Sequence, residues 1–311
     1  MTRKTNVRSL LRLVLAVYLV GVLGTGPGLA RDGPVRVVVS VPPQKTFVER
    51  VGGEHVDVHT LVRPGYDPHT YEPTPHQIAA LSAAALYIRI GIPFEQAWMA
   101  RIRSANRAMQ VLDARPGIGP HPPSAHDHGE EQVGPTAGGI HPDEHHHTGE
   151  SDPHIWTDPL LVKRMAGRIR DKLIELAPGD APDFRRNYQG FAAKLDALDR
   201  DIRSLLEPLP NRKFMVFHPA WGHFAAAYGL TQIPIERAGK EPGPRALVAL
   251  TEQASREQVK VIFVQPQFSA RSAAQVARAI GGRVLAIDPL ATDYADNLRR
   301  VARQIAGALS E

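Results

Sequence analysis

The 311-residue sequence contains no cysteine. That absence excludes a disulfide framework and a metal site built from thiolates. It also leaves no cysteine that could carry a lipid after an export signal. We therefore expect a soluble protein, in which any bound metal is held by nitrogen and oxygen atoms.

The chain beyond residue 30 also has little net charge. The whole chain has 37 basic and 32 acidic residues, but four of the basic residues and none of the acidic ones lie within residues 1–30. The remainder therefore carries 33 basic and 32 acidic residues, a net charge of +1. No sequence fingerprint of an RNA- or DNA-binding module accompanies these charges, so we expect no nucleic-acid partner.

Residues 1–30 are typical of a cleavable secretory signal. Four basic residues between Arg3 and Arg12 precede an apolar core at residues 13–23, which is too short to span a membrane comfortably. Small residues ending at Ala30 fit a cleavage site, and we expect cleavage after Ala30. These features predict export to the periplasm.

Short β-rich runs alternate with helical patterns through most of the remaining chain, which indicates an α/β fold with parallel sheets. The first block predicts strands at 35–41, 56–62, 86–90 and 109–112, with helices near 44–52, 75–84 and 94–105. The second block predicts strands at 214–217, 231–235, 259–264 and 283–287, with helices near 220–228, 244–257, 270–280 and 292–309. Two lobes follow, an N-terminal one over residues 31–181 and a C-terminal one over residues 209–311.

Between the two blocks, residues 182–208 show the pattern of one amphipathic helix. Apolar residues recur there at steps of three and four, from Phe184 to Leu205. Pro182 and Pro208 frame the pattern. We expect a single stiff helix that joins the lobes and limits their opening; the alternative is a helix packed within one lobe.

Residues 114–151 have a different composition, rich in His, Pro, Gly and acidic residues and without an apolar period. Seven of the chain's 14 histidines lie in this segment: His121, His126, His128, His141, His145, His146 and His147. Such a composition cannot bury a core and predicts a disordered loop inserted in the first lobe. We expect weak metal capture by this loop; the alternative is an inert polar linker.

The four strongest candidate metal ligands elsewhere each have a neighbouring proline: His69, His154, His218 and Asp288. Three imidazoles and one carboxylate suit a four-coordinate site for a borderline metal such as zinc. His69, His218 and Asp288 each follow a predicted strand, where binding crevices of open α/β sheets lie. His154 precedes a helix beginning near Leu160. Two ligands in each lobe would clamp a Zn²⁺ ion in the cleft between the lobes.

The other candidates are weaker. His223 lies one helical turn beyond His218 and is a less favoured ligand, while Glu72, Asp158 and Glu241 are candidate acceptors for the imidazole N–H groups. A zinc ion with three His ligands and an open fourth position could also activate water in an exported metalloenzyme. Asp288 would close that position and no nucleophile motif lies beside the ligands, so we do not expect an enzyme.

Five stretches, in order along the chain, carry a family resemblance. They are residues 61–75 (LVRPGYDPHTYEPTP), 152–159 (DPHIWTDP), 218–224 (HPAWGHF), 261–269 (VIFVQPQFS) and 288–290 (DPL). Together they resemble the motifs of the metal-specific solute-binding proteins of bacterial ABC importers, the cluster A-I or zinc-uptake type. Two positions depart from that pattern: Pro219 stands where Asp is common, and His223 stands where Tyr is usual.

The resemblance implies two α/β lobes joined by a long rigid helix, with a metal between them that is handed to the membrane subunits of an ABC permease. His69, His154, His218 and Asp288 match the family's ligand positions. Members associated with manganese generally have Glu at the third position, so His218 points to zinc. The alternatives are a manganese-binding importer component, or an extracellular metal buffer or adhesin. We expect a monomer, and a periplasmic metallochaperone is a further candidate partner.

Overall fold

The computed structural model describes residues 33–115, 152–236 and 240–310. The predicted signal at residues 1–30 lies outside the described residues, and so does the histidine-rich segment 114–151 except for its first two residues. The boundaries expected for the signal, the loop and the lobes therefore stay predictions.

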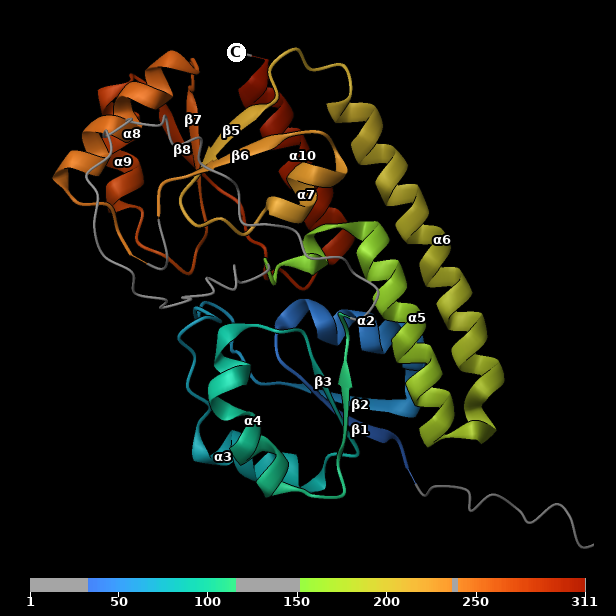
Figure 1. The fold of residues 1–311 in the computed structure, drawn as a ribbon. Helices are drawn as coiled ribbons and strands as arrows, with labels where there is room; N and C mark the ends of the chain where they lie inside the picture. The colour runs from blue at the N-terminus through green and yellow to red at the C-terminus, as the bar shows by residue number, and fades with distance from the viewer. Residues whose placement is uncertain (1–32, 116–151, 237–239, 311) are drawn as a thin grey trace, which may run out of the picture.

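Two four-stranded parallel sheets form the centres of the two lobes (Figure 1). The first contains β1 (Val35–Val39), β2 (Val56–Thr60), β3 (Leu86–Arg89) and β4 (Gln110–Asp113), in the order β2-β1-β3-β4. The second contains β5 (Lys213–Val216), β6 (Thr231–Pro234), β7 (Val261–Val264) and β8 (Arg283–Ala286), in the order β6-β5-β7-β8. The predicted fold of two α/β lobes is confirmed, and the two sheets share one strand order.

Helices connect and cover these parallel strands, as parallel pairing requires. The first lobe contains α2 (Pro42–Gly52), α3 (Pro75–Ala80) and α4 (Pro93–Ala105), and the second contains α7 (Gly222–Ala227), α8 (Pro244–Arg256), α9 (Arg271–Ala279) and α10 (Tyr294–Leu309). Four of them, α2, α3, α4 and α8, begin with proline, whose fixed φ suits the first helical position.

Two further helices lie side by side, the first along the first lobe and the second along both lobes (Figure 1). These are α5 (Pro159–Leu176) and α6 (Ala181–Leu206). The 26 residues of α6 span about 39 Å at 1.5 Å per residue. Since α6 packs against α2 of the first lobe and α10 of the second, the predicted long helix joins the lobes and is not confined to one of them.

The lobes also share a hydrophobic core. One continuous cluster of buried residues includes both sheets together with α5, α6 and α10. Phe47 of α2 makes ring contacts with Phe191 of α6 at 6.2 Å and with Tyr294 of α10 at 4.9 Å. The hydroxyl of Thr46 donates a 2.9 Å hydrogen bond to the carbonyl of Thr292 in the other lobe. Opening the lobes widely would expose part of this core, which favours a small hinge motion.

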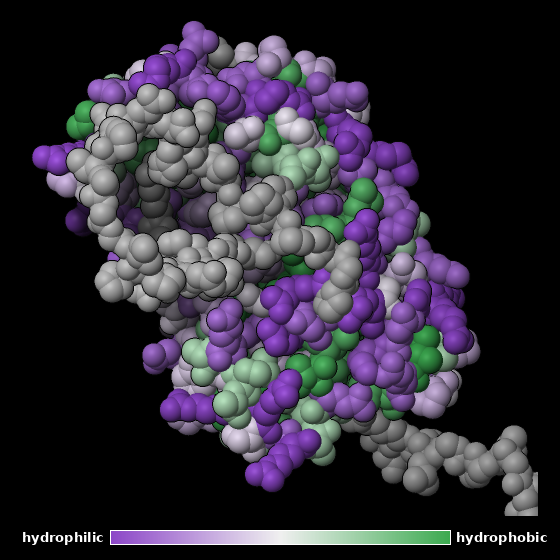
Figure 2. Space-filling view, in the orientation of Figure 1, coloured by the Kyte–Doolittle hydropathy of each residue, from purple (hydrophilic) through white to green (hydrophobic). Residues whose placement is uncertain are grey.

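The visible surface of the described residues is mainly hydrophilic, with smaller apolar patches (Figure 2). In the part of the chain that the structure describes, four large apolar side chains are exposed: Tyr66, Leu160, Leu205 and Val248. Within the described ranges, no helix combines the length and the apolar character that a membrane crossing requires.

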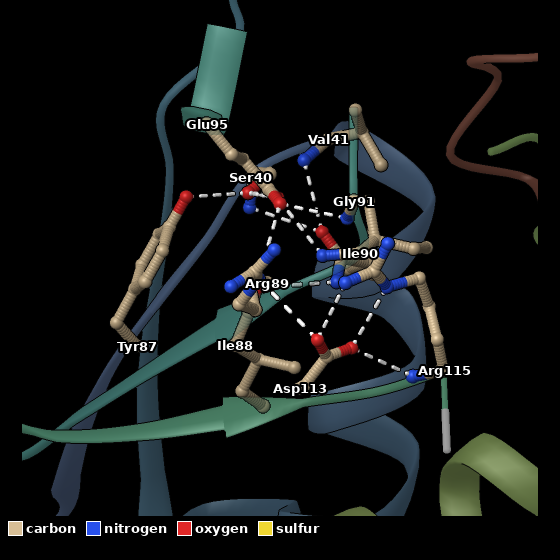
Figure 3. A network of polar contacts seen from close by, with 11 residues as sticks. Ser40, Val41, Tyr87, Ile88, Arg89, Ile90, Gly91, Glu95, Asp113 and Arg115 are labelled. Atoms are coloured by element: carbon tan, nitrogen blue, oxygen red, sulfur yellow. Dashed lines mark hydrogen bonds and ion pairs between the residues drawn. The ribbon is translucent and has the colours of Figure 1, made fainter. Parts of the chain in front are cut away.

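A buried polar network closes the carboxyl end of the first sheet (Figure 3). The carboxylate of Glu95, at the start of α4, accepts hydrogen bonds from the amides of Ile90 at 2.8 Å and Gly91 at 2.7 Å, and from the hydroxyl of Ser40. Burial, which outweighs these hydrogen bonds, raises the pKa of Glu95. The side chain of Gln44 accepts from the amides of Ser40 and Val41. Side chains of the lobe itself therefore occupy the space beyond β1 and β3.

Candidate metal centre

Three Asp-Pro-X tripeptides form the same local turn around the centre. In each, Oδ1 of the aspartate accepts a hydrogen bond from the amide two residues later, with a length of 2.9 Å for Asp67, Asp152 and Asp288. Such Asx turns compete with regular secondary structure, and the proline between donor and acceptor restricts the backbone further. The sequence thereby holds His69 and His154 in tight turns.

His218 is held by a different device. It follows β5, and its amide donates to Oε1 of Gln265 at 3.1 Å while its carbonyl accepts from Nε2 of the same side chain at 2.7 Å. Gln265 follows β7 and is fully buried. The pair bridges the carboxyl ends of β5 and β7, where the strand order of the second sheet reverses and where ligands of such sheets bind.

The structure brings three of the four predicted ligands together. Nε2 of His69 lies 3.2 Å from Nε2 of His154 and 3.0 Å from Nε2 of His218. One ring nitrogen of each residue lies within 4.8 Å of the other two. Two nitrogens bound to one tetrahedral zinc at 2.0–2.1 Å would be about 3.3–3.4 Å apart. The cluster therefore needs only small shifts to surround a zinc ion.

Asp288 is not among the atoms of this three-histidine group. Its Oδ1 accepts from Nε2 of Gln267 at 2.9 Å, in addition to the amide of Leu290. A carboxylate has a second oxygen, which Asp288 does not need for its turn. As a fourth ligand Asp288 therefore remains a prediction, with one oxygen already committed to the turn.

Burial favours the neutral form of two of the clustered imidazoles, those of His69 and His154. Desolvation, followed by the proximity of His154 and His218, lowers the pKa of His69 to about 2. Desolvation also lowers the pKa of His154, although the carboxylate of Asp152 opposes the change. Neutral imidazoles have a free ring-nitrogen lone pair, which a metal needs. At neutral pH a metal would not have to displace protons from these two rings.

Carboxylates contact the far side of two of the rings. Nδ1 of His154 lies 2.7 Å from Oδ1 of Asp152, and Nδ1 of His218 lies 3.2 Å from Oε2 of Glu236. Burial alone would raise the pKa of Asp152, but its contacts with His154 outweigh burial and lower it to about 2. An ionised carboxylate can only accept, so Nδ1 of His154 carries the proton and its Nε2 faces the cluster as a lone pair.

Sequence reasoning chose other acceptors for the imidazoles. Asp158 instead caps α5 by accepting from the amides of Leu160 and Leu161, and Glu241 accepts from the hydroxyl of Ser272. Glu72 is exposed. The sequence analysis did not identify Asp152 or Glu236 as acceptors. Glu236 could have been found, because it follows β6 at the same sheet edge as His218.

His223, the less favoured ligand, is outside the three-histidine group. It is buried, with 5% of its surface exposed, and its Nε2 lies 2.9 Å from the carbonyl oxygen of Asp152. Its Nε2 therefore contacts the turn that carries His154.

Comparison with known families places the chain among metal-uptake proteins. The family described as "Zinc-uptake complex component A periplasmic" (ZnuA) matches residues 37–308, which is most of the chain.

Individual relatives agree with this match. A "High-affinity zinc uptake system protein ZnuA" of Yersinia pestis is 27% identical over 264 residues, covering 82% of each chain. A "Zinc-binding protein AdcA" of Streptococcus pyogenes serotype M3 is 25% identical over 291 residues, 90% of this chain and 55% of AdcA, so the chain spans about half the length of that relative. A crystal structure of a ZnuA deletion mutant with zinc bound is 40% identical, with a TM-score of 0.79 over 89% of this chain and 99% of the other.

Proposed function

The chain belongs to the ZnuA family of zinc-uptake components, and from that premise we propose that it is the solute-binding component of an ABC importer. It captures one Zn²⁺ ion with high affinity between its lobes and delivers the ion to a membrane permease. The ligands are Nε2 of His69, His154 and His218 and a carboxylate oxygen of Asp288.

The convergence of three buried imidazole nitrogens carries this proposal. Each lobe contributes to the cluster, since His69 follows β2 of the first sheet and His218 follows β5 of the second. An ion bound there stabilises the closed arrangement, because its ligands come from both lobes. Loss of the ion removes this link between the three imidazoles.

The donor set favours zinc over manganese. Nitrogen-rich sites follow the order in which zinc binds far more strongly than manganese, whereas manganese prefers sites rich in carboxylate oxygen. The carboxylates of Asp152 and Glu236 face Nδ1 atoms and not the cluster, so they orient two imidazole ligands without adding oxygen ligands.

We propose the periplasm as the location, reached with the signal at residues 1–30, and the permease subunits as the protein partners. A periplasmic metallochaperone is a further proposed donor of zinc, and we propose that the protein acts as a monomer. No hydrolytic activity is expected, because Asp288 would complete the coordination that an activated water needs.

The metal content of the purified chain and a competition between zinc and manganese test this function. We expect one tightly bound zinc per chain and no displacement of zinc by equimolar manganese. Equal or stronger manganese binding would contradict the assignment. Zinc uptake by membranes containing the permease, stimulated by the loaded protein, separates an importer component from an extracellular buffer or adhesin.

A further inference from the structure

The segment that carries His154 is fastened to the second lobe, although it precedes α6 in the chain. The indole N–H of Trp156 donates a 2.7 Å hydrogen bond to the carbonyl of Pro289, which follows β8. Nε2 of His223, on α7, lies 2.9 Å from the carbonyl oxygen of Asp152. Figure 1 shows this light-green segment beside α7 and α10.

Close packing supports the same attachment. A Cβ atom on Gly222, the first residue of α7, would lie only 2.3 Å from Oδ2 of Asp152. Real Cβ atoms do not approach an oxygen so closely, so α7 reaches Asp152 because this position is glycine. The short helix η3 (Ile155–Thr157) also packs against α7.

Asp152 connects the contacts with α7 to the proposed ligand His154. Its Oδ1 accepts from the amide of His154 at 2.9 Å and lies 2.7 Å from Nδ1 of the same residue. His154 is 4% exposed and His223 is 5% exposed, so water does not replace these contacts readily. A shift of Asp152 would therefore turn the imidazole of His154 away from the other two.

We infer that the second lobe positions His154 through His223, so that His154 and His218 move together with the second lobe and His69 moves with the first. This inference rests on the proposed function and refines it. Zinc meets a preformed pair of imidazoles on one lobe, and His69 closes the site from the other. His223 acts as a positioning residue that contacts the turn and not the ion.

The sequence prediction assigned His154 to the first lobe, with two ligands in each. Its place in the chain supports that reading, but Trp156 and His223 tie the segment to the opposite side. Separation of the lobes would consequently break the cluster between His69 and the other two rings.

The test compares His223→Leu, which removes the ring donor, with His223→Gln, which restores an N–H donor. His55→Leu is the matched control, because His55 pairs with Asp180 and Asp183 away from the cluster. We measure zinc affinity by competition with a chelator and the visible spectrum of the Co²⁺-loaded proteins. His223→Leu should weaken zinc binding about tenfold, at the low end for outer-shell partners, and change the cobalt spectrum. His223→Gln and His55→Leu should match the parent in both.

Amide hydrogen exchange provides an arm that needs no metal. In the metal-free protein, His223→Leu should speed exchange at His154, Ile155 and Thr157, whereas His55→Leu should not. If His223→Leu does not fold, Trp156→Phe removes the hydrogen bond to the carbonyl of Pro289 instead. This variant should also exchange faster at the same amides and lose zinc affinity severalfold.

Parent-like zinc affinity and an unchanged cobalt spectrum in His223→Leu would overturn the inference. So would weaker zinc binding that leaves the cobalt spectrum unchanged and is not rescued by His223→Gln, because His223 would then support only the fold. A parent protein that binds no zinc tightly would instead contradict the proposed function, and the exchange data would still decide whether His223 holds the segment.

Discussion

The two sheets have the same strand order, yet their carboxyl ends are used differently. In the first sheet, the space beyond β1 and β3 is occupied by Glu95 and Gln44, which bind the amides of residues 40, 41, 90 and 91. In the second sheet, the equivalent ends of β5 and β7 are bridged by Gln265, and His218 lies there beside Glu236. In the first lobe, side chains fill the crevice that the topology provides, and in the second lobe the proposed ligand His218 lies in it.

The proposed ligand of the first lobe lies in a different place. His69 lies on the loop after β2, an edge strand of the first sheet, and that loop starts from Leu61 and Val62, whose amides bond to the carbonyls of Val39 and Ser40. A shared topology therefore provides equivalent crevices without requiring equivalent ligands. The side chains placed at each strand end decide whether the crevice serves stability or binding.

The largest effect should follow from removing the ligand at the second sheet. His218→Ala should lower zinc affinity by more than the roughly 10- to 100-fold expected for an outer-shell partner, because a direct nitrogen ligand is lost. His69→Ala should do the same. His76→Ala, a histidine at the start of α3, is the control and should bind zinc as the parent does. Isothermal titration measures all three, and undiminished tight binding by His69→Ala would remove that residue from the site.

A substitution at the carboxyl end of the first sheet should lower the free energy of unfolding and leave zinc affinity unchanged. Glu95→Ala leaves the buried amides of Ile90 and Gly91 without an acceptor, at about 1–3 kcal/mol for each unsatisfied group. We expect the free energy of unfolding to fall by about 2–4 kcal/mol in urea titrations. Glu49→Ala, which removes a half-exposed partner of Lys45, should change it little. A large loss of zinc affinity in folded Glu95→Ala would contradict the conclusion that the end of the first sheet serves stability and not binding.

The clustered rings should also give the metal-free protein a pH-dependent stability. The pKa of His69 is lowered to about 2 by burial and by its neighbouring imidazoles, so the unfolded chain takes up a proton near pH 6.5 and the folded chain does not. The stability associated with this group is therefore full above about pH 6.5 and is lost as the pH falls toward 2, by up to about 1.4 kcal/mol per pH unit.

Urea midpoints of the metal-free protein at several values between pH 7.5 and pH 4.5 measure this slope. His69→Gln should flatten it, because glutamine does not titrate. An identical slope in parent and variant would mean that His69 is not held neutral in the folded protein.

The smallest effect on the tight site is expected from deleting residues 121–147. These carry seven histidines and lie outside the described residues. The deletion should leave one tight zinc, remove weaker zinc equivalents and slow loading when zinc is scarce. Calorimetry and loading kinetics of the deletion variant measure this. Loss of the tight site would move the primary ligands into the loop, while unchanged stoichiometry and loading rate would make the segment an inert linker.

Much of the fold could be predicted because the strands are buried apolar runs between helical patterns. The ends of the elements were harder. The first strand was predicted to reach residue 41 but ends at Val39, since Ser40 and Val41 give their amides to Gln44 and Pro42 begins α2. The apolar pattern continues through these residues, and only the proline signals the turn.

The presence of His69 and His218 in the cluster could be predicted from their positions after strands. His154 follows no neighbouring predicted strand, and the contacts that support the three imidazoles could not be predicted. Asp67 and Asp152 occupy the same Asp-Pro-His tripeptide and make the same turn. The carboxylate of Asp152 also contacts the imidazole of its histidine, whereas Asp67 accepts from the hydroxyl of Thr70. Identical tripeptides thus receive different roles from their surroundings, and for Asp152 these include Gly222 and His223 of the other lobe.

A crystal of the zinc-loaded protein, measured on both sides of the zinc absorption edge, tests the central claim most directly. We expect one strong anomalous peak between the lobes, about 2.0–2.1 Å from Nε2 of His69, His154 and His218. The peak should also have an oxygen neighbour from Asp288. A principal peak elsewhere, or one that lacks any of the three imidazoles, would contradict the account.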